Sequence, residues 1–391
     1  MRKVNIFLIF FSFTAEIFCL QLLLIFIPLV VFYSGGGEIN SSISRSAGFI
    51  GPVLFGYYIG KLTDIFNKRI LGASIALTIA LVSGFFALTF KNFNYNSLIF
   101  YMIFLSIFSY FLINIRSSVM PMLIQDSSLN KANGFFVVIE NTVTLVSPGI
   151  CSLLLYFGKP QFGFYLTTFL FFVSAIAYFF GLRQIENNKP SNSNDNSIFK
   201  TWGILKSNKQ LLHLCLLIMA SNAFLAIYTL YLIIFISKHN ITSNILSPFI
   251  MIPSACSAIL AGLYTVKLLP RYSLSNFSIF CSLAIFLAGV LPLISKNLFS
   301  IILSSCLEGF FTSSLVIAVW TLRQRVVSKE TLGQVTGLTS ALFKLSITIT
   351  LPLAGILSSM YGESSALLFG SSLILVGIIP FIYNRSDFKI Y

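Results

Sequence analysis

The sequence predicts an all-α integral membrane protein that crosses the bilayer twelve times. Three observations support this prediction: an apolar composition, twelve long apolar runs and an uneven distribution of basic residues. Of the 391 residues, 57% are hydrophobic and only 9% are charged, and the mean hydropathy is +0.91. An ordinary soluble domain has about 25% charged residues. The composition therefore excludes a soluble enzyme, a nucleic-acid-binding domain and a disordered protein, because such a chain needs lipid as its solvent.

Most of the apolar runs are close to the length that a membrane helix requires. A bilayer core about 30 Å thick needs about 20 apolar residues per helix. We predict spans at residues 5–33, 45–60, 70–90, 98–115, 133–157, 162–182, 211–236, 246–266, 276–294, 299–321, 334–358 and 364–383. The run at 45–60 is short, and we expect it to extend by about one turn at each end. The first run is too long for a signal peptide and lacks a cleavage motif, so it is interpreted as a membrane helix.

Basic residues indicate the orientation of the spans. With the N-terminus in the cytoplasm, most of the 25 Lys and Arg residues fall in inner segments. The outer segments hold only Arg45, Lys91, Lys159, Lys238 and Lys296. Cytoplasmic loops carry an excess of Lys and Arg, so the pattern predicts a multi-pass protein with both termini in the cytoplasm. It also explains the net charge of +14 without a nucleic-acid partner. The abundance of Phe, Ile, Asn and Lys favours a bacterial inner membrane.

One long polar stretch, residues 184–210, divides the runs into two sets of six. Its core is rich in Asn, Ser and Lys, which is typical of a flexible cytoplasmic linker. We therefore predict six-helix bundles at residues 1–183 and 211–391. Residues 199–206 are expected to form a short amphipathic helix on the inner membrane surface.

The two sets of runs share a sequence pattern. The fifth and eleventh runs hold similar features in the same order. The matched pairs are Leu129 and Leu332, Gly134 and Gly337, Glu140 and Lys344, and Pro148 and Pro352. A duplicated six-helix unit is typical of transporters whose halves rock around a central site. Chance similarity is the alternative, because Gly and Pro are frequent in membrane helices.

Four ionisable residues lie inside the predicted spans: Glu16, Glu140, Glu308 and Lys344. Charges in a bilayer are costly, so these residues are functional candidates. Desolvation raises the pKa of a carboxyl group, which allows proton uptake and release near neutral pH. Glu16 is the first candidate because no basic residue lies near it in sequence, whereas Lys344 can pair with Glu308 or Glu140. The alternative is that all four form fixed ion pairs that hold helices together.

The remaining polar residues give no sign of a cofactor. His213 and His239 fall near membrane edges and are interpreted as interfacial residues. The six cysteines lie inside apolar runs without a C-x-x-C pair, so they are expected to pack as small apolar side chains. We expect neither a metal site nor a cofactor.

The segment after the second run reads Gly-Lys-Leu-Thr-Asp-Ile-Phe-Asn-Lys-Arg over residues 60–69. Gly60 permits close helix packing, Asp64 can cap or pair with a neighbouring helix, and Asn67 suits a left-handed turn. The segment resembles motif A of the major facilitator superfamily, G-x-L-x-D-x-x-G-[RK]-[RK], at Gly60, Asp64 and Arg69. Ile65 and Asn67 depart from the motif. The resemblance implies two pseudo-symmetric six-helix bundles and a charge relay through Asp64 that stabilises the outward-facing state.

A second resemblance points to a subfamily. Arg116 ends the fourth run and is followed by Pro121 and the string Leu-Asn-Lys-Ala-Asn-Gly at residues 129–134. This pattern is similar to the loop between helices 4 and 5 of proton-driven exporters that include macrolide efflux proteins and the enterobactin exporter. Residues 324–327 and 332–335 resemble the matching loop of the second half. The resemblance implies a monomer with a cavity lined by helices 1, 4, 7 and 10.

The fifth run also carries a variant of an antiporter motif. Residues 147–152 read Ser-Pro-Gly-Ile-Cys-Ser where antiporters of the superfamily often carry G-P-x-x-G-G. Small side chains still permit close packing, so Pro148, Gly149 and the matching Pro352 are predicted to pack helices. The replaced glycines weaken the inference of antiport.

These observations predict a secondary transporter driven by the proton gradient. The resemblance implies export of a small amphiphilic molecule, such as a macrolide, and export of a self-made siderophore is the alternative. A membrane-embedded lipid-modifying enzyme is disfavoured, because the sequence shows no cluster of catalytic residues at one membrane face. A channel is disfavoured by the internal repeat and by motif A. Membrane lipid and the transported molecule are the expected partners.

Overall fold

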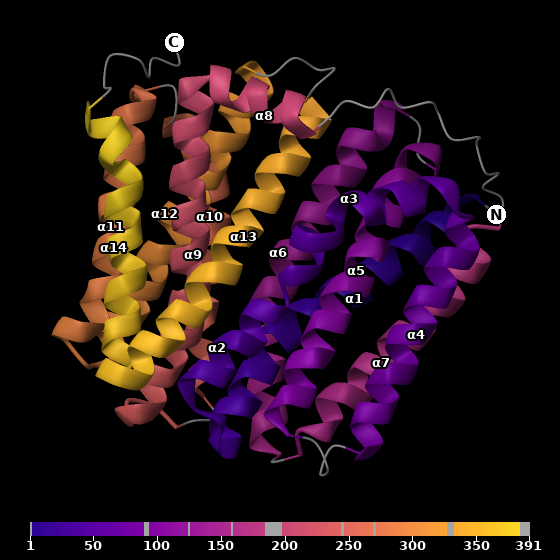
Figure 1. Cartoon of the computed structure of the whole chain (residues 1–391), viewed down its shortest axis with the longest axis horizontal. Coiled ribbons are helices and arrows are strands. Elements are labelled where there is room, and N and C mark those ends of the chain that lie inside the picture. The colour runs from indigo at the N-terminus through magenta and orange to yellow at the C-terminus, as the bar shows by residue number, and fades with distance from the viewer. Residues whose placement is uncertain are drawn as a thin grey trace. The chain divides into compact units, whose positions relative to one another are not determined.

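The structure is a computed structural model that describes residues 2–89, 94–123, 126–157, 159–183, 198–243, 246–268, 271–326 and 332–383. These residues form helices joined by short connections, and none of them lies in a strand (Figure 1). Ten stretches among them are long and apolar enough to cross a membrane. Two further helices, α3 (Ile50–Ile65) and α6 (Asp126–Tyr156), bring the number to the twelve predicted crossings. The prediction of an all-α membrane protein is confirmed.

The chain forms two compact units, which we call unit 1 and unit 2. Unit 1 comprises residues 1–36 and 47–193, and unit 2 comprises residues 37–46 and 194–391. The division of the sequence into bundles 1–183 and 211–391 stays a prediction. One short helix from the first part of the chain, α2 (Gly37–Ala47), packs almost entirely in unit 2.

Unit 1 contains six long helices, each close to a predicted span. They are α1 (Arg2–Val31), α3 (Ile50–Ile65), α4 (Lys68–Thr89), α5 (Tyr95–Leu123), α6 (Asp126–Tyr156) and α7 (Gln161–Gly181). Helix α1 packs against α5, α6 and α7, and α4 packs against α7. The rings of Phe86, Tyr101 and Phe164 form a buried cluster between α4, α5 and α7, with centroids 4.8 Å apart for Phe86–Tyr101 and 5.3 Å apart for Tyr101–Phe164.

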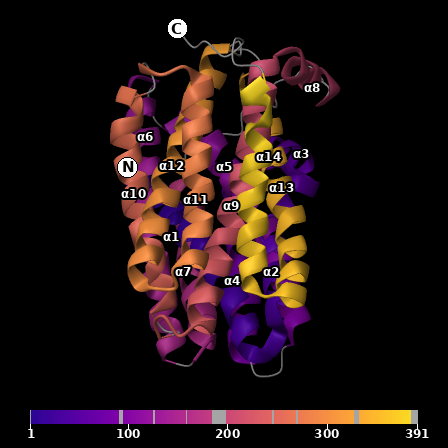
Figure 2. The same ribbon diagram turned by 90° about the vertical axis from the view of Figure 1, so that its left-hand side faces the viewer.

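Unit 2 contains α2 and the helices of the second half of the chain. They are α2 (Gly37–Ala47), α8 (Ile198–Ser207), α9 (Lys209–Lys238), α10 (Met251–Leu268), α11 (Leu274–Ile294), α12 (Leu298–Val326), α13 (Leu332–Tyr361) and α14 (Glu363–Tyr383). A 3-10 turn, Ser247–Ile250, leads into α10. Helix α9 is the most enclosed of these helices and packs against α12, α13 and α14 (Figure 2).

The short helix expected at residues 199–206 is confirmed as α8. It packs against α9 and α13 through a small buried cluster of Leu205, Leu211, Cys215 and Val335. The core of the predicted linker, residues 184–197, lies outside the described residues.

The first connection differs from the sequence-based expectation. Helix α1 passes through a kinked turn, Phe32–Gly36, directly into α2, with Gly35 at φ 86° and Gly37 at φ 68°. Arg45 therefore lies on a helix and is 7% exposed, and its assignment to the outer side of the membrane stays a prediction. Helix α2 is rich in Ser, and a search for apolar runs cannot detect a polar helix that is buried by protein instead of lipid.

Several helices also extend beyond the apolar runs. Helix α5 continues to Leu123 and α12 to Val326. The prediction that Arg116 ends its helix was therefore wrong. Hydropathy marks where the chain leaves the hydrocarbon, whereas a helix with suitable residues continues into the interface.

Candidate functional site

Glu16 lies on α1 inside unit 1 and is 4% exposed. Helices α5, α6 and α7 pack around α1, so the carboxylate is enclosed by protein. The hydroxyl of Tyr178, on α7, donates a hydrogen bond to this carboxylate. Oxygen Oε1 of Glu16 has no hydrogen-bond partner among the described residues. One oxygen is thus held in place and the other is open to a proton or a ligand.

The nearest opposite charge comes from α5. Arg116 interacts electrostatically with Glu16, and its guanidinium lies 3.6 Å from the centre of the Phe13 ring, one turn before Glu16 on α1. Arg116 also interacts electrostatically with Glu140 on α6. The sequence suggested that Glu16 had no basic neighbour, but the structure brings one from a helix about 100 residues away in the chain. Glu16, Arg116, Glu140 and Tyr178 are called the unit 1 polar site below.

A glycine on α4 fixes the position of Tyr178. A Cβ atom built on Gly72 would lie 2.9 Å from the Tyr178 ring, closer than ordinary contacts allow. Only glycine lets α4 approach the ring at this distance. The hydrogen bond to Glu16 therefore depends on close packing between α4 and α7.

Glu308 is the corresponding buried acid of unit 2. It lies on α12 and is 2% exposed. The hydroxyl of Ser254, on α10, donates to its Oε2 over 2.6 Å. At the next residue the two helices touch, because a Cβ atom on Gly309 would lie 2.0 Å from the Ser254 carbonyl oxygen. Within the described part of the chain, Glu308 forms no ion pair.

The other two predicted intramembrane charges are on α6 and α13. Glu140 is exposed on α6 in unit 1, and Lys344 is half-buried on α13 in unit 2. The suggested pairing of Lys344 with Glu308 is not formed, because the ion pairs among the described residues do not include Glu308.

The motif around residues 60–69 spans the end of α3 and the start of α4. Arg69 donates from Nε to the carbonyl of Phe179 over 2.7 Å and stacks 4.1 Å from the centre of that ring. Asn67 accepts hydrogen bonds from the amides of Arg69 and Ile70 at 3.0 and 3.4 Å. Asn67 therefore caps α4 and does not adopt the left-handed turn that we expected. Asp64 lies in the last turn of α3, and its side chain is outside the description.

The expected packing role of Gly60 is not seen. A Cβ atom on Gly60 would meet no atom within 4 Å. Pro148 and Pro352 lie inside α6 and α13, which continue through them as helices. Pro148 is buried and its neighbour Gly149 is half-buried, and the packing role of these residues stays a prediction.

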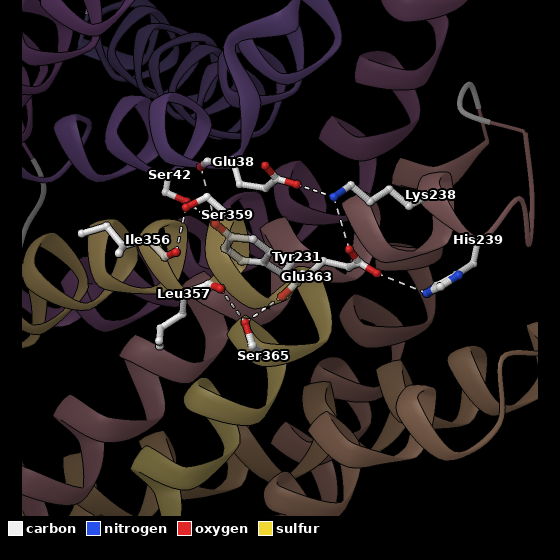
Figure 3. A network of polar contacts seen from close by, with 11 residues as sticks. Glu38, Ser42, Tyr231, Lys238, His239, Ile356, Leu357, Ser359, Glu363 and Ser365 are labelled. Atoms are coloured by element: carbon white, nitrogen blue, oxygen red, sulfur yellow. Dashed lines mark hydrogen bonds and ion pairs between the residues drawn. The ribbon is translucent and has the colours of Figure 1, made fainter.

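A network of charges that the sequence analysis did not identify joins α2, α9 and α14 in unit 2 (Figure 3). Lys238 contacts the carboxylate of Glu38 and lies 3.3 Å from that of Glu363, while Nε2 of His239 lies 3.2 Å from Glu363 on its other side. Nearby, the hydroxyls of Ser42 and Tyr231 are 2.6 Å apart. The sequence offered one signal for this network: Glu38 and Glu363 are two of only 11 acidic residues in the chain, and both lie at the start of a helix.

The described residues contain no group of three or more His, Cys, Asp or Glu side chains placed to hold a metal ion. In unit 1, the Glu16 carboxylate can gain or lose a proton, or bind a charged group, under the influence of Arg116.

Comparisons with known proteins identify the family of this chain. Residues 6–277 match the model of the Major Facilitator Superfamily. A comparison with curated proteins finds no match. A variant of the nucleoside transporter NupG has a TM-score of 0.78 and 17% identity, with 99% of this chain and 100% of that chain covered.

Two further solved structures are also similar over nearly the whole chain. A bacterial homologue of the human lysosomal transporter Spinster has a TM-score of 0.80 at 10% identity, covering 99% of this chain and 97% of that chain. A bacterial homologue of the iron transporter ferroportin has a TM-score of 0.75 at 15% identity, covering 97% and 98%. At these identities the likeness shows the fold alone. The family match covers more than half of the sequence, and the chain belongs to the Major Facilitator Superfamily of membrane transporters.

Proposed function

We propose that this transporter exports a small amphiphilic molecule, such as a macrolide, in exchange for protons. It acts as a monomer in a bacterial inner membrane, with both termini in the cytoplasm, and uses alternating access. The observation that carries the proposal is the unit 1 polar site, where a buried carboxylate keeps one oxygen unpaired beside an arginine.

The charges of this site leave room for one proton. Arg116 interacts electrostatically with two carboxylates, Glu16 and Glu140, so two acids share the field of this guanidinium. An excess charge at membrane depth is costly. A proton on Glu16 neutralises one of the two acids that act on Arg116 and leaves the attraction of Glu140 in place. Loss of that proton restores the competition between the two carboxylates for one guanidinium.

We infer that this competition is how the proton acts on the helices. Glu16, Arg116 and Glu140 stand on α1, α5 and α6. When Glu16 is neutral, the Arg116 side chain is attracted to α6 more than to α1. A shift of this kind changes the relative stability of two arrangements of the helices, which is what coupling requires.

Helix α2 is the element that we propose responds to this change. Gly36, which precedes α2, and Ala47, the last residue of α2, belong to unit 1, while residues 37–46 pack in unit 2. Movement of one unit against the other must therefore bend the chain at the ends of α2 or release it. Gly35 and Gly37, with positive φ, supply the backbone freedom for a bend.

The choice of substrate rests on the resemblance to macrolide exporters and is the least constrained part of the proposal. The similar structures are described as transporters of different substrates, including nucleosides and iron. They do not favour one substrate over another.

The experiment uses inverted membrane vesicles that hold a proton gradient, followed with a pH-sensitive dye. Macrolides are added first and siderophores second, to wild-type protein and to Glu16→Gln. We expect macrolides to dissipate the gradient with wild type and not with Glu16→Gln. Glu308→Gln is the matched control, because it makes the same substitution at the buried carboxylate of unit 2 and leaves the unit 1 polar site intact. If only siderophores dissipate the gradient, the proposed substrate changes from a macrolide to a siderophore. Normal proton exchange by Glu16→Gln would overturn the role of this residue.

A further inference from the structure

Unit 2 contains a cavity of about 430 Å³ between α10, α11 and α12. Its wall includes Tyr272, Phe277, Phe280 and Cys281 from the first half of α11 and the preceding turn. Phe311, from α12, completes the aromatic side, with its ring 5.5 Å from that of Phe280 in an edge-to-face arrangement. The volume and the aromatic lining are those of a ligand site.

Among the described residues that line the buried floor of the cavity, the hydroxyl is already engaged in hydrogen bonds. This hydroxyl belongs to Ser314, which pairs with the Thr265 hydroxyl at 2.7 Å and donates to the carbonyl of Phe310 at 2.8 Å. A water molecule needs several polar partners to occupy a cavity. The floor therefore favours a hydrocarbon chain over water or a polar solute.

The mouth of the cavity is different in character. Phe280, on α11, is 62% exposed, and Tyr272, in the turn before this helix, is 55% exposed. Helix α11 is long and apolar enough to cross the membrane (Figure 2). The amide side chain of Asn276 and the exposed Arg271 lie at the same end of α11. By the distribution of Lys and Arg this end faces the cytoplasm. The cavity thus joins an apolar floor to a polar, positively charged rim at the depth of lipid headgroups.

We propose that the cavity binds one anionic phospholipid of the cytoplasmic leaflet. An acyl chain fills the space between Phe277 and Phe311, and the phosphate is held near Arg271 and Asn276. Charge complementarity favours an anionic headgroup over a zwitterionic one. The cavity is formed entirely within unit 2, so movement between the units does not open it to alternate sides, and we assign it to a lipid and not to the transported molecule.

The test measures lipid bound to the full-length protein by native mass spectrometry. Purified protein is exposed to phosphatidylglycerol and phosphatidylethanolamine with identical acyl chains. Wild type is expected to retain phosphatidylglycerol preferentially. Cys281→Phe, which fills the cavity, is expected to lower retention by about tenfold, the effect of losing roughly two buried methylene groups. Cys256→Phe is the matched control, because Cys256 is exposed on α10 and does not line the cavity.

A second variant separates the headgroup from the acyl chain. Arg271→Gln is expected to bind both lipids equally and to keep most of the total lipid. Equal retention of lipid by Cys281→Phe and wild type would overturn the proposal. Displacement of the lipid by a macrolide would also overturn it, because the cavity would then be a substrate site.

A third measurement does not depend on the stability of the cavity-filling variant. Phe277 is 7% exposed, so a tryptophan introduced by Phe277→Trp is shielded from bulk lipid. Phospholipids brominated in the acyl chain are expected to quench its fluorescence if a chain enters the cavity. Absence of quenching beyond that of the native tryptophans contradicts the proposal.

Discussion

Glu16 and Glu308 are both buried carboxylates on membrane helices, but the two units surround them differently. Glu16 has an arginine, a tyrosine hydroxyl and one unpaired oxygen. Glu308 has the hydroxyl of Ser254 and no comparable influence from a cation, although neither carboxylate forms an ion pair with the described residues. The difference shows that a residue type at membrane depth does not define a role. The charge next to it decides whether a proton changes the balance of forces between helices.

The largest effect that sharpens this comparison is expected from Arg116→Met. Without the guanidinium, Glu16 keeps a buried carboxylate with no compensating charge, which destabilises a protein by about 3 kcal/mol or more. Thermal unfolding in detergent should show a clear decrease in stability. The double variant Glu16→Gln with Arg116→Met should recover part of the loss, because the two effects are coupled. Additive losses in the double variant would mean that the two residues do not interact.

A smaller effect is expected where α10 and α12 touch. Gly309→Ala places a methyl group against the Ser254 backbone, and overpacking of this kind costs about 1–3 kcal/mol. The shift should move Ser254 away from Glu308 and lower the unfolding temperature. Gly262→Ala is the matched control on α10, since a Cβ atom there meets nothing within 4 Å. Equal stability of the two variants would show that the close approach at Gly309 is not a constraint.

The network at the end of α2 should give the smallest effects, because its charges are partly solvated. The Lys238 side chain is 38% exposed, and exposed ion pairs contribute less than about 1 kcal/mol. Glu363→Gln removes contacts to both Lys238 and His239, whereas Glu38→Gln removes only one. Glu363→Gln should therefore lower the unfolding temperature more than Glu38→Gln. A larger decrease for Glu38→Gln than for Glu363→Gln would contradict this prediction and would show that the contact between Lys238 and Glu38 on α2 contributes most of the stability.

The fold was largely predictable because lipid imposes a simple rule. Any segment that meets hydrocarbon must be apolar and helical, so hydropathy located the crossings and even α8 was detected by its amphipathic pattern. Helix α2 was not found, since it is a polar segment covered by protein. Its burial depends on contacts such as Ser42 with Tyr231, far apart in the sequence, and no local pattern reveals them.

The candidate site was predictable only in part, for a related reason. The cost of burying a charge identified Glu16 and Glu308 from the sequence alone. Their partners come from other helices and cannot be read from the sequence near each acid. Arg116, which acts on Glu16, was assigned to a loop motif. Lys344 was suggested as a partner of Glu308, whereas the structure places Ser254 there. Packing glycines such as Gly72 and Gly309 also gave no signal, because glycine is frequent in membrane helices for several reasons.

The central claim is that Glu16, and not Glu308, binds the coupled proton. The most direct measurement is the change in pH when a transported macrolide is added to purified protein in weakly buffered detergent solution. Wild type and Glu308→Gln should each release about one proton per protein molecule, because binding of the substrate and the proton are linked through the same carboxylate. Glu16→Gln should bind the macrolide without releasing a proton. Proton release by Glu16→Gln, together with its loss in Glu308→Gln, would contradict the account.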